Sequence, residues 1–303
     1  MAIDKKYWKR YSEFWDDFVK HWFLSGANPR DSVSELYREV VDFNADELPE
    51  PYLGNPEFGV DAVFLNLNPG MSVNGKYGAF KGKNLEATKF FSNINAPAGW
   101  LIREFKDIAN CSYKDFVARR SSLDPKLRGH EFEVCGVDWW QGNNPEKVTG
   151  RMTWVRQIYG NDELCPSRVF APEICPFHSP KFPTNGLQKL TGFIGEHVIV
   201  PAAVAVIEND LPFAVAVGKS YVNVLTNIGA QLENAWSSSA PVNEWPKKNN
   251  GDYKKRTYKL YSLTVDCVGC ARFLVTYAQG GNNPPCGEFK PVEAAIRRYI
   301  VRK

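Results

Sequence analysis

The sequence predicts an α/β protein, a three-layer α/β/α sandwich around a central, mainly parallel, four-stranded sheet. Four apolar runs, at 62–67, 168–175, 212–220 and 271–279, alternate with segments of helical spacing. Each run enters a loop of unusual composition, reading NLNPG, CPFHSP, GKS and GGNNPP in chain order. Because parallel strands end at one edge of their sheet, we expect these four loops to lie along the same edge.

The segments around these runs predict the rest of the architecture. Residues 5–24 repeat aromatic side chains at helical spacing, and 32–41 predicts a second helix with Asp31 or Ser32 as its cap. Further helices are expected at 85–108, from Gly186 to the Pro201 region, at 220–228 and from Val292 onward, and 233–256 is expected to be an exposed loop. We expect 1–58 to form an N-terminal helical extension and 59–303 the main domain, with insertions near 110–165 and 230–257.

Composition narrows the class of protein. The chain of 303 residues is 44% hydrophobic and carries a net charge of +3, which permits nucleic-acid binding without requiring it. Seven cysteines and a charged N-terminus without an apolar segment favour a reducing cytoplasm. The most apolar stretch, Val198–Ile207, is short and contains Pro201, so no membrane span is expected. No obligate protein partner is predicted.

Three possible chemistries have weak sequence support. Gly218-Lys219-Ser220 lacks the upstream glycine of a phosphate-binding loop, which argues against nucleotide hydrolysis. The NNPP stretch at 282–285 is followed by Cys286 where an amino-methyltransferase has an aromatic residue. Cys267 and Cys270 have metal-ligand spacing, with Cys286 downstream, but a fourth ligand from Cys165, Cys175 or His178 requires the fold to bring it close. We therefore expect no metal and no organic cofactor.

The loop after the first apolar run carries a more specific signal. The stretch Leu65-Asn66-Leu67-Asn68-Pro69-Gly70 is similar to the Gly-Ile-Asn-Pro-Gly motif of the mismatch-specific uracil/thymine-DNA glycosylases, in the uracil-DNA glycosylase superfamily. The order of the other three loops agrees with this resemblance, which covers about residues 60–300. This chain departs from the motif at Asn66, which replaces its leading glycine.

The resemblance implies a DNA glycosylase, which flips a base out of DNA and hydrolyses its N-glycosidic bond. Asn68 would orient the attacking water, with Asn66 beside it, while Pro69 and Gly70 would stiffen the loop and permit close backbone approach. Phe80, with Tyr77 nearby, would stack on the extruded base. The DNA contacts implied are Lys81, Lys83, Lys219, Gly281, Asn282 and Asn283. The alternative for the loop is a plain strand-to-helix turn.

The end of the second run bears on which base is read. The resemblance implies that this strand carries a base-reading side chain, and Glu173 stands in that register. A carboxylate suits the exocyclic amine of a cytosine-type base and repels the O4 of uracil. His178 or Ser179 would contact a base substituent or a phosphate. The sequence thus predicts a glycosylase for a modified base, a modified cytosine among the candidates, in DNA repair or defence against phages. Glu173 as a buried, paired carboxylate remains the structural alternative.

Two other functions fit the same sequence. One is a non-catalytic nucleic-acid-binding protein of the same fold, and the other is an α/β hydrolase of nucleoside-like small molecules. Basic residues of the 233–256 segment, Arg256 among them, are expected to contact DNA phosphates, with a plain solvated surface as the alternative.

Overall fold

The central feature of the fold is one mixed β-sheet. The computed structural model describes residues 6–25, 32–41, 43, 51–53, 56, 59–67, 151–164, 168–177, 179, 186–238, 256–278 and 290–301. Their strands form a seven-stranded sheet in the order β1-β3-β2-β4-β7-β6-β5. The strands are β1 Tyr52–Leu53, β2 Ala62–Leu65, β3 Val169–Pro172, β4 Ala214–Val217, β5 Gln231–Ser238, β6 Arg256–Val265 and β7 Gly269–Ala278.

The four predicted apolar runs are the four central strands, and they are mutually parallel. β2 pairs in parallel with β3 and β4, and β4 pairs in parallel with β7. All residues of β2, β3 and β4 are buried, as expected for strands covered on both faces. The α/β class is therefore confirmed, whereas the predicted count of four strands is wrong because β1, β5 and β6 add antiparallel pairs at the two ends.

The largest error of the sequence prediction concerns the segment expected to be an exposed loop. Residues 233–238 belong to β5, and Arg256 opens β6, which pairs with β7 over ten consecutive residue pairs. β5 is an edge strand of mostly polar, half-exposed residues, so it shows no apolar run. Antiparallel strands of this kind are difficult to recognise by the composition that identifies a buried parallel strand.

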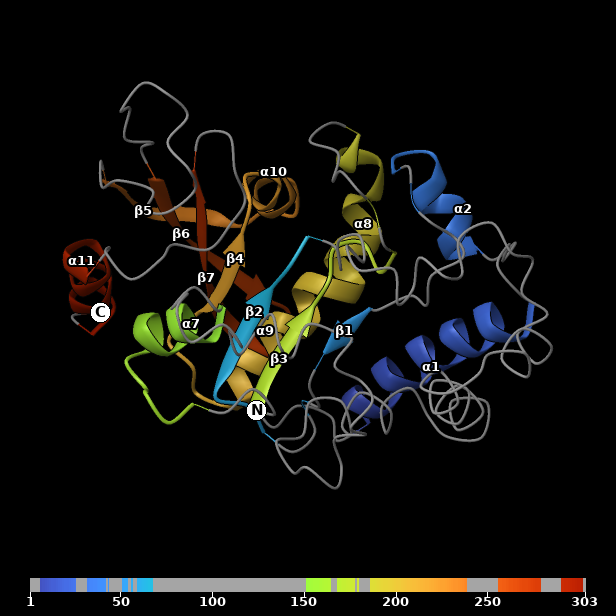
Figure 1. Ribbon diagram of the computed structural model, residues 1–303, viewed down its shortest axis with the longest axis horizontal. Coiled ribbons are helices and arrows are strands. Elements are labelled where there is room, and N and C mark those ends of the chain that lie inside the picture. Colours follow the sequence, from blue (N-terminus) through green and yellow to red (C-terminus); the bar gives the residue numbers. More distant parts are fainter. Residues whose placement is uncertain are drawn as a thin grey trace, which may run out of the picture.

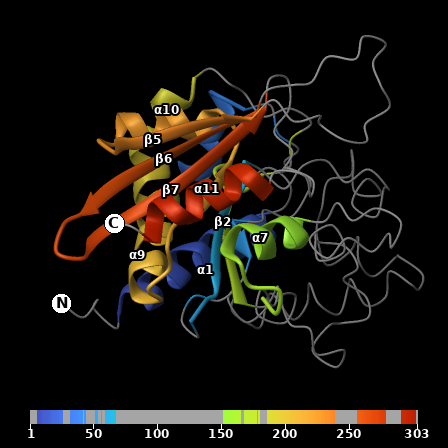
Figure 2. The same cartoon turned by 90° about the vertical axis from the view of Figure 1, so that its left-hand side faces the viewer.

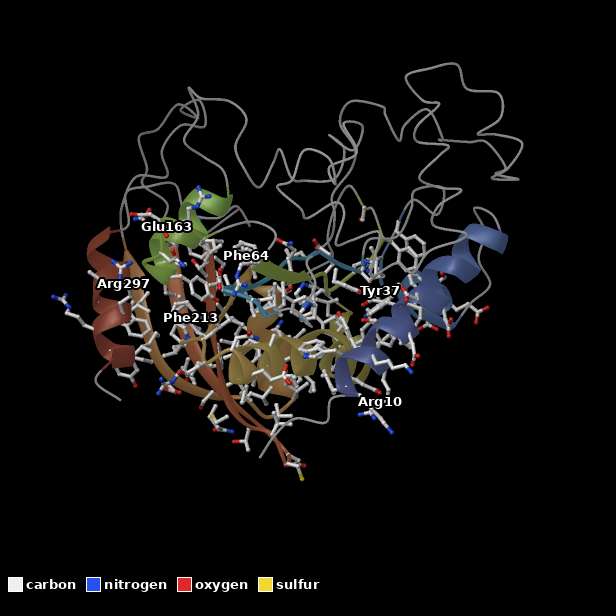
Figure 3. The ribbon with its side chains drawn as sticks, turned by 90° about the horizontal axis from the view of Figure 1, so that it is seen from below. Arg10, Tyr37, Phe64, Glu163, Phe213 and Arg297 are labelled. Atoms are coloured by element: carbon white, nitrogen blue, oxygen red, sulfur yellow. The ribbon has the colours of Figure 1, made fainter. Side chains whose placement is uncertain are left out.

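Side chains alternate between two hydrophobic cores on opposite faces of the sheet. Val63 and Leu65 of β2 pack in the first core, with aromatic residues of α1 (Tyr7–Ser25), and with α9 (Val200–Glu208) and α10 (Ser220–Asn227). Phe64 packs in the second core, under α7 (Arg151–Tyr159) and α11 (Lys290–Val301). Figure 1 shows α1 and α2 (Ser32–Arg38) beyond the β1 end of the sheet and α11 near β5 at the other end. Figure 3 shows Phe64 and Phe213 on the side of α7.

The helical stretch before β4 continues past the proline where we expected it to end. It comprises η4 (Leu187–Leu190), α8 (Thr191–Ile194), the π-helical turn η5 (Gly195–Ile199) and α9. Pro201 lacks an N–H donor and crowds the preceding turn, and the wider π turn immediately before it lets the helix continue. By length and composition this stretch of 22 residues is able to cross a membrane, yet 61% of its most apolar window is buried inside the protein.

The strand order determines where a binding crevice is expected. The chain passes from β2 to β3 on one side and then to β4 on the other side of β2. In open α/β sheets the crevice lies at the carboxyl ends of the two strands between which the order reverses, here β2 and β4. Figure 2 shows the β6–β7 hairpin projecting with its turn away from the body of the protein, so the turn lies at the edge opposite to this crevice.

Candidate functional site

A buried polar pair occupies the carboxyl end of β2. Asn66 forms a parallel bridge with Glu173, the residue that follows β3. The Asn66 side-chain amide donates a hydrogen bond to Glu173 Oε1 at 2.9 Å, and the two residues are 2% and 5% exposed. A carboxylate is rarely buried unless it is hydrogen-bonded, and the amide meets that need in part. The two residues singled out by separate sequence arguments therefore touch at the predicted edge of the sheet.

The backbone around this pair is held by a dense set of hydrogen bonds. Asn66 N–H donates to the Pro172 carbonyl at 3.1 Å, and Ile174 N–H donates to the Asn66 carbonyl at 3.0 Å. Cys175 N–H donates to the Leu67 carbonyl at 2.9 Å, so parallel pairing continues beyond the ends of both strands. Two buried tyrosine hydroxyls also bond to this backbone: Tyr221 donates to the Asn66 carbonyl and Tyr37 donates to the Ile174 carbonyl. The backbone that carries Asn66 and Glu173 is thus held by hydrogen bonds from several elements.

The end of β4 approaches the end of β2 very closely. Gly218 has a φ of 130°, and a Cβ built there would lie 2.9 Å from Leu67 Cδ1. Its N–H donates to the Thr276 carbonyl of β7 at 2.9 Å, which ties three strand ends together. Lys219 follows as an exposed residue at the start of α10, and Ser220 is buried. Glycine is favoured here because an L side chain at this φ and this distance would be strained and crowded.

Register places further polar groups in the same row across the sheet. Phe64 and Leu65 pair with Val215 and Ala216, so Asn66 stands opposite Val217, which pairs with Thr276. Alternation puts Asn66, Glu173 and Thr276 on the face of the second core, since their neighbours two residues earlier pack there. Thr276 lies two strands from Asn66, about 10 Å away by ordinary strand spacing. The row is therefore a polar margin of an otherwise apolar face.

Arg256 belongs to this margin, contrary to expectation. It is 2% exposed and its guanidinium Nη1 donates to Thr276 Oγ1 at 3.2 Å. We expected Arg256 to contact DNA phosphates or to be part of a solvated surface, but it is buried and forms the last pair of the β6–β7 ladder, with Ala278. The basic run before it hid this strand start, because charged residues at a strand terminus resemble a loop.

The cysteines of the described region do not come together. Cys267 and Cys270 are exposed at the β6–β7 turn, whereas Cys175 is buried at the carboxyl edge. β7 separates these places by its ten residues, about 30 Å of extended chain, so Cys175 is excluded as a ligand beside Cys267 and Cys270. Within the described residues no group of three His, Cys, Asp or Glu side chains is arranged to hold a metal ion.

Cys175 is also unsuited to act as a nucleophile. Burial raises the pKa of its thiol, a backbone hydrogen bond with Phe177 opposes this shift in part, and the nearby Glu173 adds to it. The thiol is therefore protonated at neutral pH, and the thiolate is the form that reacts. Burial likewise raises the pKa of Tyr37, so its hydroxyl stays a donor to the Ile174 carbonyl.

Of the predicted site residues, the structure describes Asn66, Glu173, Ser179 and Lys219. Asn66 and Glu173 are in contact, and Lys219 lies at the end of the neighbouring strand β4. The remaining predicted residues lie outside the described residues: Asn68, Pro69, Gly70, Tyr77, Phe80, Lys81, Lys83, His178, Gly281, Asn282 and Asn283. Sequence reasoning missed Tyr37, Tyr221 and Thr276, whose positions on helices and strands match ordinary core residues.

Comparison of the chain with family models, curated proteins and solved structures finds no significant match.

Proposed function

We propose that this protein is a DNA glycosylase that extrudes a modified base bearing an exocyclic amine, with modified cytosine as the main candidate, and leaves an abasic site. The observation that carries the proposal is the buried Asn66–Glu173 pair at the carboxyl ends of β2 and β3. It lies directly before Asn68-Pro69-Gly70, the part of the chain that resembles the glycosylase motif. DNA repair and defence against phages with altered DNA are the two contexts we propose.

The pair supports recognition of an amine rather than a carbonyl. A carboxylate accepts hydrogen bonds and has no proton to donate when ionised, so Glu173 is complementary to the N4 amine of cytosine and repels the O4 of uracil. Asn66 Nδ2 lies 2.9 Å from Glu173 Oε1, and this hydrogen bond orients the Glu173 carboxylate before the base binds. In this proposal Asn66, which replaces the motif's glycine, is the residue that sets base choice.

The reaction follows from the residue types in the proposed roles. Water adds to C1′ of the sugar, the C1′–N bond breaks, and its electron pair leaves on the base, which takes up the proton released by the water. Asn68 orients the water, and because an amide does not accept a proton as a carboxylate does, turnover is expected to be slow. Phe80 supplies a stacking surface that offsets part of the few kcal/mol needed to flip the base.

A panel of oligonucleotides tests the proposal. Each oligonucleotide carries a single test base: cytosine, 5-methylcytosine, 5-hydroxymethylcytosine, glucosylated hydroxymethylcytosine, uracil or mismatched thymine. The release of free base and the formation of alkali-labile sites are measured. We expect release of at least one cytosine derivative and loss of that release in Asn68→Ala. Release of uracil but of no cytosine derivative contradicts the base assignment. No release from any oligonucleotide, with DNA binding unchanged in Asn68→Ala, contradicts the glycosylase proposal and leaves a binding protein or a small-molecule hydrolase.

Glu173→Gln tests the role of the charge in an isosteric background. Loss of a charge-assisted hydrogen bond corresponds to about 1.5–3 kcal/mol, so release of the amine-bearing base should fall roughly 10–150-fold. The new amide donates to a carbonyl, so relative activity on uracil should rise. Glu233→Gln is the matched control, because Glu233 of β5 is paired with Arg272 of β7, away from the carboxyl ends of β2 and β3. Equal base preference in Glu173→Gln and wild type argues against base reading by Glu173.

A further inference from the structure

Two tyrosines from different helices bond to adjacent strand ends. Tyr221 of α10 donates its hydroxyl to the Asn66 carbonyl, and Tyr37 of α2 donates to the Ile174 carbonyl. Both side chains are fully buried, at 0% exposure, in the first core. α2 comes from the N-terminal part of the chain and α10 from the segment after β4, so distant parts of the sequence meet at this one edge. Figure 3 shows Tyr37 on the side of α1 and α2.

The tyrosine bonds act on the same peptide units that carry the polar pair. The Asn66 carbonyl accepts from both Ile174 N–H, at 3.0 Å, and the Tyr221 hydroxyl. Ile174 in turn offers its own carbonyl to Tyr37, so one connected set of bonds runs from α2 through Ile174 and Asn66 to α10. The Asn66 carbonyl belongs to the peptide unit that joins Asn66 to Leu67. Restraint of this carbonyl therefore restrains the backbone that carries the Asn66 side chain.

The tyrosines and the polar pair lie on opposite faces of the sheet. Tyr221 and Tyr37 approach from the first core, while Asn66 and Glu173 lie at the margin of the second. The tyrosine hydroxyls thus reach the backbone carbonyls from the face opposite to the polar pair. A residue that bonds to the backbone from the opposite face of the sheet is suited to position a site without contacting the ligand of that site.

We propose that Tyr221 and Tyr37 are positioning residues, which hold the Asn66 and Ile174 carbonyls from the opposite face of the sheet and so fix the Asn66–Glu173 pair. This inference rests on the proposed function for its catalytic consequence, but not for the backbone restraint itself. It also gives α2 a role in the site, although α2 lies in the part of the sequence expected to be a packed extension.

Tyr159 provides a matched control at the other end of the same strands. Its hydroxyl donates to the Phe213 carbonyl at 2.6 Å, lies 3.1 Å from the Val63 carbonyl, and accepts from Val63 N–H at 3.2 Å. It thus bonds to the backbone of β2, and to that just before β4, from α7, far from the carboxyl edge. Tyr→Phe at each position removes one hydroxyl and leaves the ring in place.

The experiment compares Tyr221→Phe, Tyr37→Phe and Tyr159→Phe in the full chain. Each should lower the thermal midpoint by a few degrees, since each loses a buried hydrogen bond. We expect kcat for base release to fall tenfold or more in Tyr221→Phe, and less in Tyr37→Phe, with KM for DNA little changed. Tyr159→Phe should keep its kcat. If kcat falls in proportion to the loss of stability in all three variants, Tyr159→Phe included, the positioning role is overturned.

Amide hydrogen exchange supplies a readout that does not depend on activity. The N–H groups of Ile174 and Cys175 donate across the strand ends to the Asn66 and Leu67 carbonyls. Their exchange should quicken at least fivefold in Tyr221→Phe, relative to exchange elsewhere in the sheet, and stay unchanged in Tyr159→Phe. Unchanged exchange in Tyr221→Phe refutes the backbone restraint. If the wild-type protein releases no base while exchange behaves as expected, the proposed function fails and the restraint stands.

Discussion

Gly218→Ala tests the close approach between the ends of β4 and β2. A residue with a side chain at a φ of 130° is strained by about 1–3 kcal/mol. The added Cβ would meet Leu67 Cδ1 at 2.9 Å, Cδ2 at 3.1 Å and Cγ at 3.2 Å. Because Cγ is among these atoms, rotation of the Leu67 methyl groups alone does not relieve the contact, and overpacking adds about 1–3 kcal/mol.

The two contributions together predict a loss of about 2–6 kcal/mol in the free energy of unfolding. At about 2–4 °C per kcal/mol for a large domain, the thermal midpoint should fall by roughly 4–24 °C. Gly229→Ala is the control, because Gly229 has a φ of 90° but no atom within 4 Å of a built Cβ. The loss of unfolding free energy in Gly229→Ala should therefore come from backbone strain alone. Urea unfolding of both variants measures the difference between their losses.

A double-mutant cycle with Leu67→Ala isolates the contact. Leu67 is 8% exposed, and its truncation alone should cost about 2–5 kcal/mol through the cavity it leaves. Since the truncation also makes room for the methyl group that Gly218→Ala introduces, the double variant should be more stable than the sum of the single losses predicts, by about 1–3 kcal/mol. Additivity within about 0.5 kcal/mol would refute the steric argument.

Two further predictions concern groups away from the polar pair. Burial lowers the pKa of His197, which stacks on Phe14 at 4.1 Å, and Glu196 opposes this shift in part. The folded state therefore favours the neutral ring, its stability is complete above pH 6.5, and it should decline as the pH falls through 6.5 toward the folded pKa. Urea unfolding between pH 8 and 5 should show this decline in the wild type and a smaller one in His197→Phe; equal slopes contradict it. Cys267→Ser should leave base release unchanged, because the β6–β7 turn lies at the opposite edge. A maleimide should modify Cys267 in the native protein, and impaired base release by the variant would contradict this placement.

The parallel part of the sheet could be predicted from the sequence for a definite physical reason. Strands buried on both faces must be apolar throughout, and the runs at 62–67 and 212–220 stand out against polar surroundings. β5 and β6 were missed because an edge strand and its neighbour need apolar residues on one face only. The continuation of the helix through Pro201 depends on a π turn, which leaves no compositional mark.

The candidate site could be predicted only where the type of a residue departs from that of its neighbours in the sequence. Asn66 and Glu173 are polar residues at the ends of apolar strands, so their departure from the pattern is visible in the sequence. Tyr221 was not predicted, because a tyrosine on the apolar face of a helix is typical of a core residue. Its role depends on which carbonyl its hydroxyl reaches, and this is decided by the tertiary packing of α10 against β2.

The order of strands in the sheet has a consequence for synthesis of the chain. β2 pairs with β4 through Leu65 and Ala216, so 151 residues separate these partners along the chain. At ribosomal rates of about 5–20 residues per second, roughly 8–30 s pass before the partner strand of β2 has been made. During that interval at least one side of a fully apolar strand lacks its partner, which is a hazard for aggregation on the ribosome. A lower growth temperature and co-expressed chaperones should therefore raise the soluble yield of this protein more than that of a protein built from local hairpins.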